Sequence, residues 1–152
     1  MSPDRLSPSE RSALMARIRA RDTRPELRVR SLLHRSGYRF RLHARDLPGR
    51  PDIVFRRRRK VIFVHGCFWH RHPGCPRATF PSTRVDYWRL KFDANCARDA
   101  AVQSALHEMG WTVFVVWECE VRRDDDLIGR LRAFLGPPRS SCTTVPLQRI
   151  RS

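Results

Sequence analysis

Long hydrophobic runs and a leader-like start are both absent from this 152-residue chain. No apolar stretch approaches the ~18 residues that a membrane-spanning helix requires, so a membrane span is excluded. The first residues, Met1 to Arg5, lack the apolar segment of a secretory signal, and we expect a cytoplasmic protein with no membrane partner. The length suits one globular domain rather than two.

Acidic residues are scarce and lysine is nearly absent. The chain has 15 Asp and Glu against 31 Lys and Arg, a net charge of +16, and Lys60 and Lys91 are its only lysines. This excess favours a polyanion as partner, most commonly nucleic acid. Arginine binds phosphate oxygens in pairs, which suits DNA, although the composition of a GC-rich genome would also explain the arginines. The 41% of hydrophobic residues is enough for a packed core and excludes wholesale disorder.

The cysteine count is odd, which argues against a disulfide framework in a reducing compartment. Cys67, His72 and Cys75 lie in a loop without periodicity, and Cys119 follows a strand. Three sulfurs and one imidazole form a complete structural zinc set; the alternative is that they are small buried side chains. A zinc deaminase is excluded, because Cys75 has no cysteine partner three residues away.

Capping signals and periodicity predict an α-α-β-β-β-α-β-α chain with a mixed sheet, an α/β fold. Ser7–Glu10 and Thr23–Glu26 have the pattern of helix capping boxes. The predicted helices begin at 7–10 and cover 23–37, 84–109 and 124–135, and the predicted strands cover 38–42, 53–55, 61–64 and 111–117. Arg56–Arg59 is typical of a solvated hairpin loop. We expect residues 1–20 to be a DNA-contacting arm, 21–136 the core, and 137–152 a disordered tail.

Several residues have both a functional and a purely structural interpretation. Asp52, in a turn that enters a strand, suits a divalent metal, but a turn aspartate also bonds its own backbone. Glu26 completes the pattern of a helix capping box, whether or not it also has a functional role. Asn95 and Asp99 share one helix face, which a solvated face with Arg98 would also explain.

Aromatic side chains lie in or beside the predicted zinc loop. They are Phe68, Trp69 and Trp88. Such rings either pack beneath the loop or protrude, and protruding rings in a basic protein can wedge between base pairs.

Two motifs carry a resemblance to a known family. Pro48–Asp52 and the hexapeptide His65–His70, His-Gly-Cys-Phe-Trp-His, strongly resemble the very short patch repair DNA mismatch endonucleases, the Vsr family. Further matches are Arg21–Thr23 with Glu26, Thr83–Arg84 with Tyr87–Trp88, Asn95 with Arg98–Asp99, and Gly110–Trp111 with Val116–Cys119. The similarity covers roughly residues 10–135.

The resemblance implies a restriction-endonuclease-like α/β fold and a nick 5′ to the thymine of a T:G mismatch, which arises when 5-methylcytosine deaminates. It implies that Asp52 and the carbonyl of Val64 hold catalytic Mg²⁺; the family often has Thr where Val64 stands. By similarity His70 is the general base, and the site is completed by His65, Asp99, Asn95 and Glu26.

The resemblance also implies a structural Zn²⁺ held by Cys67, His72, Cys75 and Cys119. The segment before Cys75 is one residue longer than in relatives, which leaves His70 as an alternative ligand to His72. Phe68, Trp69 and Trp88 match rings that intercalate beside the mismatch, and Met15 matches a residue that enters from the other groove.

Two other functions compete with a mismatch endonuclease. One is a zinc-stabilised module that binds distorted DNA without cutting, and the other is a non-specific nickase. A pure binder has no use for a carboxylate such as Asp52 beside phosphate. The partner implied is double-stranded DNA with a T:G mismatch, bound by a monomer because the mismatch has no two-fold axis. Repair proteins are further expected partners, and the flanking sequence that is read stays open.

Overall fold

The computed structural model describes residues 7, 9–10, 21–123 and 125–139. Its elements are the helices α2 (Arg24–Arg35), α3 (Val85–Glu108), α4 (Glu118–Arg123) and α5 (Leu127–Leu135), the 3-10 turn η1 (Arg56–Arg58), and the strands β1 (Arg41–Leu42), β2 (Ile53–Phe55), β3 (Lys60–His65) and β4 (Thr112–Trp117). Met15, the body of the first predicted helix and residues 140–152 lie outside the described residues.

A four-stranded mixed sheet forms the centre of the molecule, in the order β1-β2-β3-β4. The first two pairings are antiparallel, whereas β3 and β4 are parallel, with Val64 opposite Val116. The parallel pair requires a long crossover, and the loop after β3 together with α3 supplies it. The predicted α/β class with a mixed sheet is therefore confirmed.

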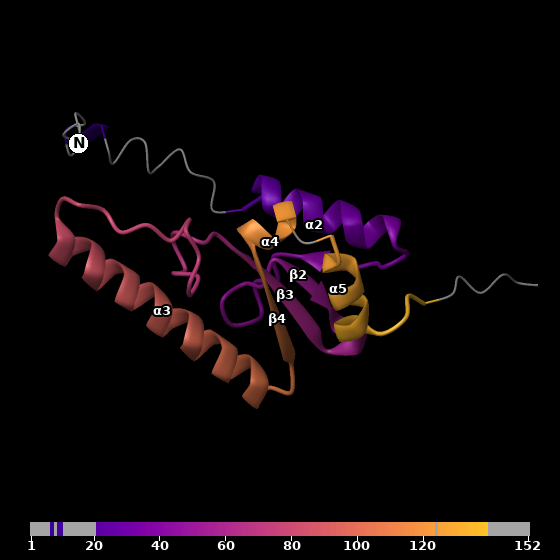
Figure 1. Ribbon diagram of the computed structural model, residues 1–152. Helices are drawn as coiled ribbons and strands as arrows, with labels where there is room; N and C mark the ends of the chain where they lie inside the picture. Colours follow the sequence, from indigo (N-terminus) through magenta and orange to yellow (C-terminus); the bar gives the residue numbers. More distant parts are fainter. Residues whose placement is uncertain (1–6, 8, 11–20, 124, 140–152) are drawn as a thin grey trace, which may run out of the picture.

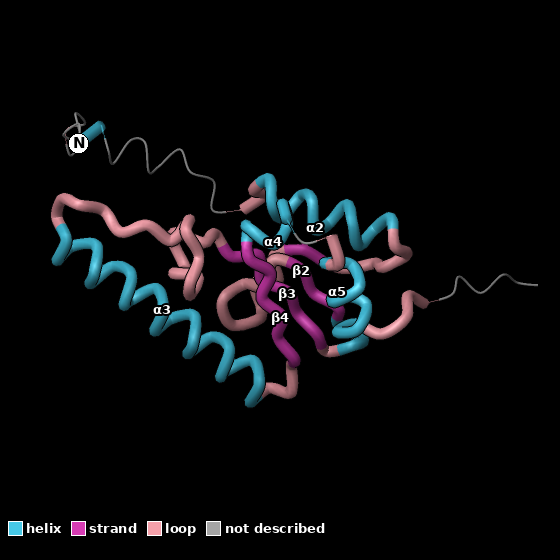
Figure 2. The backbone as a smooth tube through the Cα atoms, in the orientation of Figure 1, coloured by secondary structure: helices cyan, strands magenta, loops and turns pink. Residues whose placement is uncertain are grey.

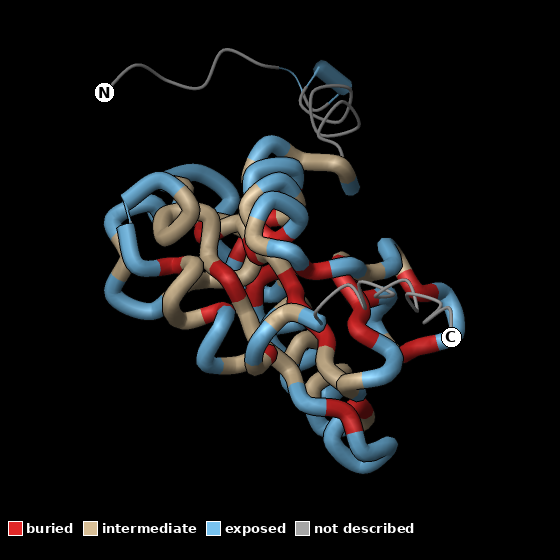
Figure 3. The backbone as a smooth tube through the Cα atoms, turned by 90° about the vertical axis from the view of Figure 1, so that its right-hand side faces the viewer, coloured by how far each residue is buried: buried red, intermediate tan, exposed pale blue. Residues whose placement is uncertain are grey.

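Helices cover both faces of the sheet (Figure 1). On one face, Val29 and Leu33 of α2 and Leu131 of α5 pack with Ile62. On the other face, Leu106 from the C-terminal half of α3 packs on Val54, Val61 and Phe63. The strands β2 and β3 are almost entirely buried, whereas both residues of β1 are exposed; Figure 3 colours the backbone by burial.

The capping signals give the right helix starts. The Ser7 backbone N–H donates to Glu10 Oε2 at 2.7 Å, and the Glu10 N–H donates to Ser7 Oγ at 3.2 Å, which completes a capping box. Thr23 is the N-cap of α2, and its Oγ1 accepts from the Glu26 N–H at 3.4 Å. Both signals are local, which explains why the sequence alone reveals them.

Two predictions of local structure are wrong, and one helix was not predicted. The strand predicted over 38–42 is paired only at Arg41–Leu42, because Tyr38 turns into the core instead. Residues 118–123 form α4, which was not foreseen, and the last helix begins at Leu127 rather than at 124.

None of the helices in the described ranges has the length and apolar character needed to cross a bilayer.

The arginine run after β2 forms the predicted connection of the β2–β3 hairpin, with Arg56, Arg57 and Arg59 exposed and Arg58 partly buried. Arg58 donates to the carbonyls of Leu135 and Pro137 at 2.6 and 2.7 Å, at the C-terminal end of α5. Arg59 donates to the Met109 carbonyl at 2.6 Å and lies over the Trp111 ring. The Arg58 cation thus lies at the negative C-terminal end of α5, and the Arg59 cation lies at that of α3.

Candidate active site and metal centre

Asp52 is fixed at the point where the turn after β1 enters β2. Its Oδ2 accepts from the Val64 backbone N–H of β3 at 2.7 Å, and its carbonyl accepts from the His43 N–H at 3.2 Å. Burial raises the pKa of Asp52 to about 7; the Val64 N–H opposes this rise and the neighbouring Glu26 carboxylate adds to it. A bound cation would relieve this unfavourable charge, so a divalent metal fits the donor set here.

Glu26 has a second role besides helix capping. Its side chain is buried, and its Oε2 accepts from the Asp22 N–H at 3.0 Å and from Arg30 Nη2 at 2.8 Å. The first turn of α2 thus brings the Glu26 carboxylate next to Asp52. The structure therefore supports both the capping interpretation and the functional interpretation of Glu26.

His65 and His70 form a stacked pair, with ring centroids 3.9 Å apart and planes inclined by 8°. His70 Nδ1 donates to Asp99 Oδ2 of α3 at 2.6 Å, and this leaves the other ring nitrogen of His70 to act as an acceptor. Burial lowers the pKa of His65 to about 4, with a further contribution from His70. At neutral pH His65 is thus an uncharged imidazole.

Asn95 contacts the loop after β3 and is not among the residues that line the cleft described below. Its Nδ2 donates to the Trp69 carbonyl at 3.1 Å, so it ties the loop after β3 to α3. The contact assigns Asn95 a holding role in the described structure.

These side chains line one cleft of about 1360 Å³. It includes Glu26, Asp52, His65, His70 and Asp99. Its edges carry a set of cations, namely Arg21, Arg45, Arg50, Lys91 and Arg98. A cleft with acids at the bottom and cations at the rim suits a phosphodiester backbone approached by a divalent metal.

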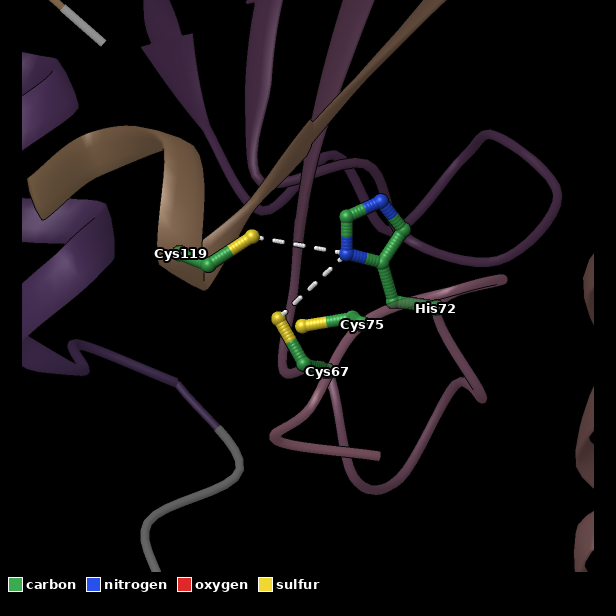
Figure 4. A group of neighbouring side chains, drawn as sticks. All are labelled: Cys67, His72, Cys75 and Cys119. Carbon is green, nitrogen blue, oxygen red and sulfur yellow. Dashed lines mark hydrogen bonds between the residues drawn. The ribbon is translucent and has the colours of Figure 1, made fainter. Parts of the chain in front are cut away.

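The four predicted zinc residues meet at the start of the loop (Figure 4). Their ligand atoms all lie within 4.8 Å of one another, and Cys119 comes from α4, far along the chain. His72 Nδ1 lies 3.4 Å from the Cys119 sulfur and 3.7 Å from that of Cys67. His70 is bound to Asp99 instead, so the alternative ligand is not in this cluster.

The chemistry of the cluster fits a thiophilic cation. Burial raises the pKa of the Cys67 thiol to about 12 and also raises that of Cys119. Burial acts the same way on Cys75, but the backbone N–H of Arg77, the thiols of Cys67 and Cys119 and the backbone N–H of Ala78 together outweigh it and lower the pKa of that thiol. Three neighbouring sulfurs become thiolates together only when a cation balances their charge, as zinc does in a site with three cysteines and one histidine.

The aromatic residues of the loop pack on one another. Phe68 makes edge contacts with Trp69, Trp88 and Phe92 at centroid distances of 5.1, 5.8 and 5.2 Å. Trp88 is buried, and its indole N–H has no partner among the described residues. Phe68 and Trp69 are only partly buried, so these two present ring surface beside the cleft.

Arg71 holds the loop together and was missed by the sequence analysis. The loop from residue 66 to 84 contains no helix or strand (Figure 2). The Arg71 guanidinium donates to the carbonyls of Phe68, Ala78 and Thr79 at 3.2, 2.9 and 2.9 Å. It also lies 4.1 Å above the Phe92 ring of α3. No local pattern marks such a residue, because its partners follow from the path of the loop.

Arg30 and His43 were missed as well. Arg30 Nη2 bonds Asp22 and Glu26, both at 2.8 Å, and it lies 3.2 Å from His43 Nε2. The spacing of Glu26 and Arg30, four residues apart on a helix, is a signal that could have found the pair.

Comparison with known proteins gives a consistent result. A family model described as DNA mismatch endonuclease Vsr matches residues 3–76. The chain is 57% identical over 134 residues to the type II nicking enzyme V.XorIIP of Xanthomonas oryzae pv. oryzae, covering 88% of this chain and 98% of that relative. It is 46% identical to the DNA mismatch endonuclease Vsr of Escherichia coli K12, covering 77% and 74%. It is 39% identical to the type II nicking enzyme V.NmeAIP of Neisseria meningitidis, covering 78% and 84%.

Proposed function

The chain belongs to the Vsr family of DNA mismatch endonucleases, and from this we propose that it nicks one DNA strand 5′ to the thymine of a T:G mismatch. The observation that carries the proposal is a single cleft holding Asp52 beside Glu26 together with the His70–Asp99 pair. The chain is a DNA endonuclease; the T:G substrate, the Mg²⁺ dependence and the start of very short patch repair are what we propose.

Mg²⁺ is the proposed catalytic cation, held by the Asp52 carboxylate and the Val64 carbonyl. The N–H of Val64 points to Asp52, and the N–H and C=O of a strand residue point to the same side, which supports this pair of ligands. When bound, Mg²⁺ stabilises negative charge on the scissile phosphate and activates water. The buried Glu26 supplies a second carboxylate beside Asp52 to orient water around the cation.

His70 is the proposed general base. The bond from its Nδ1–H to Asp99 fixes the ring and leaves the opposite nitrogen free to accept the proton of the attacking water. The water oxygen bonds to phosphorus, the bond to the 3′ oxygen breaks, and a solvent proton completes the 3′ hydroxyl, which leaves a 5′ phosphate. His65 stacks on His70 and, being neutral, does not add charge next to the base.

Zinc is proposed as the structural ion at Cys67, His72, Cys75 and Cys119. The cluster anchors both ends of the segment that carries His70 and the aromatic rings. Its role is to hold this loop, within a restriction-endonuclease-like fold, and it takes no part in the chemistry.

Mismatch preference is proposed to come from the rings beside the cleft. Phe68 and Trp69 insert next to the mismatch, Trp88 supports them from beneath, and Met15 on the arm of residues 1–20 enters from the other groove. Unstacking a base step costs a few kcal/mol and costs less where pairing is already poor, which favours a T:G site over matched DNA. We further propose a monomer acting in the bacterial cytoplasm, with repair proteins as partners.

A binding module that does not cut DNA is the second candidate. Partly exposed rings and the cationic rim would serve such a module equally well. The buried acidic pair argues against it, because a carboxylate beside phosphate repels DNA unless a cation lies between them.

The test uses labelled duplexes that differ at one pair, T:G or T:A, in a CTAGG-like context and in a series of other flanks. Each is incubated with the zinc-loaded protein and Mg²⁺, with Mg²⁺ omitted as the metal control, and strands are resolved under denaturing conditions. We expect a nick 5′ to the mismatched thymine only with T:G and Mg²⁺. Equal cutting of T:A would identify a non-specific nickase, and retention without cutting on every flank would favour the binding module.

Asp52→Ala should keep mismatch binding and abolish nicking. Asp46→Ala is the matched control, since Asp46 is an exposed carboxylate of the same turn that bonds Arg56 at 2.6 and 2.9 Å outside the cleft. A nicking Asp52→Ala protein would show that the metal site is wrongly assigned.

A further inference from the structure

A cluster of possible metal ligands next to Asp52 already contains a cation from the protein. One ligand atom from each of Asp22, Glu26 and His43 lies within 4.8 Å of the others. Arg30 Nη2 reaches all three, at 2.8 Å from Asp22 Oδ1, 2.8 Å from Glu26 Oε2 and 3.2 Å from His43 Nε2. A single guanidinium nitrogen thus takes the place that a metal ion would occupy among these atoms.

The contacts of Glu26 are concentrated on one of its two oxygens. Oε2 accepts from the Asp22 N–H and from Arg30, and it lies 3.4 Å from His43 Nε2. The Glu26 carboxylate also lies close enough to Asp52 to raise the pKa of that residue. These three neighbours of Oε2 therefore hold the carboxylate in place beside Asp52.

Burial makes the charge of Arg30 important. The side chain of Glu26 is 3% exposed and that of Arg30 is 14% exposed, so water screens the pair poorly. The positive charge of Arg30 also acts at Asp52, where it opposes the influence of Glu26. Arg30 thus lowers the negative charge of the whole acidic group.

We propose that Arg30 is a positioning residue for nicking, which holds the Glu26 carboxylate beside Asp52 and serves as its internal counter-ion, so that no divalent metal occupies the Asp22–Glu26–His43 cluster. This inference rests on the proposed Mg²⁺-dependent nicking. It assigns Arg30 no contact with DNA or with the reacting phosphate.

The geometry makes a specific prediction about substitutions. Because one nitrogen makes all three contacts, the ammonium of a lysine can replace much of the function of the guanidinium. Arg30→Met keeps an unbranched apolar stem at this position and removes the charge. Arg28→Met is the matched control, since Arg28 is an exposed arginine of the same helix.

The experiment measures two quantities on zinc-loaded proteins: the single-turnover nicking rate on T:G duplex at saturating Mg²⁺, and Mn²⁺ binding without DNA by titration calorimetry. For Arg30→Met we expect a nicking rate at least tenfold lower, Mn²⁺ binding at least threefold tighter, and unchanged affinity for T:G duplex. Arg30→Lys should nick within about threefold of the wild type, and Arg28→Met should match it.

General damage to the fold would weaken Mn²⁺ binding, so slower nicking with tighter Mn²⁺ binding distinguishes positioning from disruption. The inference is overturned if Arg30→Met nicks within twofold of the wild type, if its Mn²⁺ affinity is not raised, or if Arg30→Lys is as slow as Arg30→Met. Arg30→Gln, a neutral donor, replaces Arg30→Met if the latter does not fold, with the same thresholds.

The two proposals fail in different ways. A wild-type protein that does not nick T:G duplex overturns the proposed function and this inference with it. The inference alone is overturned by a different set of results. In that case the wild type nicks T:G duplex and Asp52→Ala does not, but Arg30→Met behaves like the wild type.

Discussion

Asp52→Asn should stabilise the metal-free protein at alkaline pH while it abolishes nicking. The native pKa of Asp52 is about 7, raised from an ordinary value of 3.8 mainly by burial. Because the folded state holds this proton more tightly than the unfolded state, the contribution of Asp52 to stability is complete below pH 3.8. It is lost as the pH rises to 7.

The size of the effect follows from the two pKa values. A rise from 3.8 to about 7 corresponds to roughly 4 kcal/mol, which the ionised carboxylate costs the folded protein above pH 7. An asparagine at this position still accepts from the Val64 N–H and carries no charge beside Glu26. The free energy of unfolding of Asp52→Asn should therefore equal that of the wild type near pH 4 and exceed it by roughly 4 kcal/mol at pH 8.

Urea unfolding of the zinc-loaded proteins from pH 4 to pH 8, without Mg²⁺, tests this. Asp46→Asn serves as the control, since this exposed carboxylate of the same turn should show no such gain at pH 8. Adding Mg²⁺ should stabilise the wild type and leave Asp52→Asn unchanged, because the neutral amide lacks the negative charge that the proposed site needs to hold the cation. Parallel pH profiles for wild type and Asp52→Asn would refute the assignment of a strained, buried carboxylate.

Other contacts lead to further predictions. Because burial lowers the pKa of His65 to about 4, the contribution of His65 to native stability should fall by about 3 kcal/mol between pH 6.5 and pH 4, so the free energy of unfolding of His65→Gln should rise by about that amount relative to the wild type over this interval in the same urea series. Cys67→Ser should release zinc, measured with a colorimetric chelator, and should lose nicking although zinc takes no part in the chemistry; retained nicking by the zinc-free protein would contradict the holding role. Asp99→Asn, which no longer fixes His70 as a carboxylate does, should lower the single-turnover rate roughly 100-fold with unchanged duplex affinity. Arg58→Ala should cost about 1–2 kcal/mol in urea unfolding by removing its bonds at the end of α5, and its nicking rate should equal that of the wild type.

Local signals in the sequence predicted the frame of this fold well. The boundaries of α2 follow from Thr23 and Gly37, and the apolar run of β3 leads directly to His65. The short element α4 was not foreseen. It follows β4 without a break, and residues 118–120 have no apolar periodicity to announce a turn of helix.

In the candidate site, too, residues marked by a local pattern were predicted from the sequence, and residues whose partners come from distant segments were not. The proposed zinc ligands of the loop were predicted from their spacing, and the structure shows that Cys119, in α4 directly after β4, lies with them in one cluster. The network around Arg30 and the three carbonyls bound by Arg71 depend on segments that meet only after folding. Because the chain contains so many arginines, nothing in its sequence distinguishes Arg30 and Arg71 from the others.

The order of residues between His65 and His72 has a consequence for how this chain can evolve. His65 and His70 face the cleft, whereas Cys67 and His72 face the metal cluster, so the two centres alternate along one segment. The His70 N–H donates to the Gly66 carbonyl and the His72 N–H donates to the Cys67 carbonyl, each at 3.1 Å. These two hydrogen bonds fix the backbone path of the segment that both centres share. One inserted or deleted residue here would misalign both centres at once. Length changes that survive selection should therefore lie beyond His72, in the remainder of the loop, which contributes only Cys75 to the two centres.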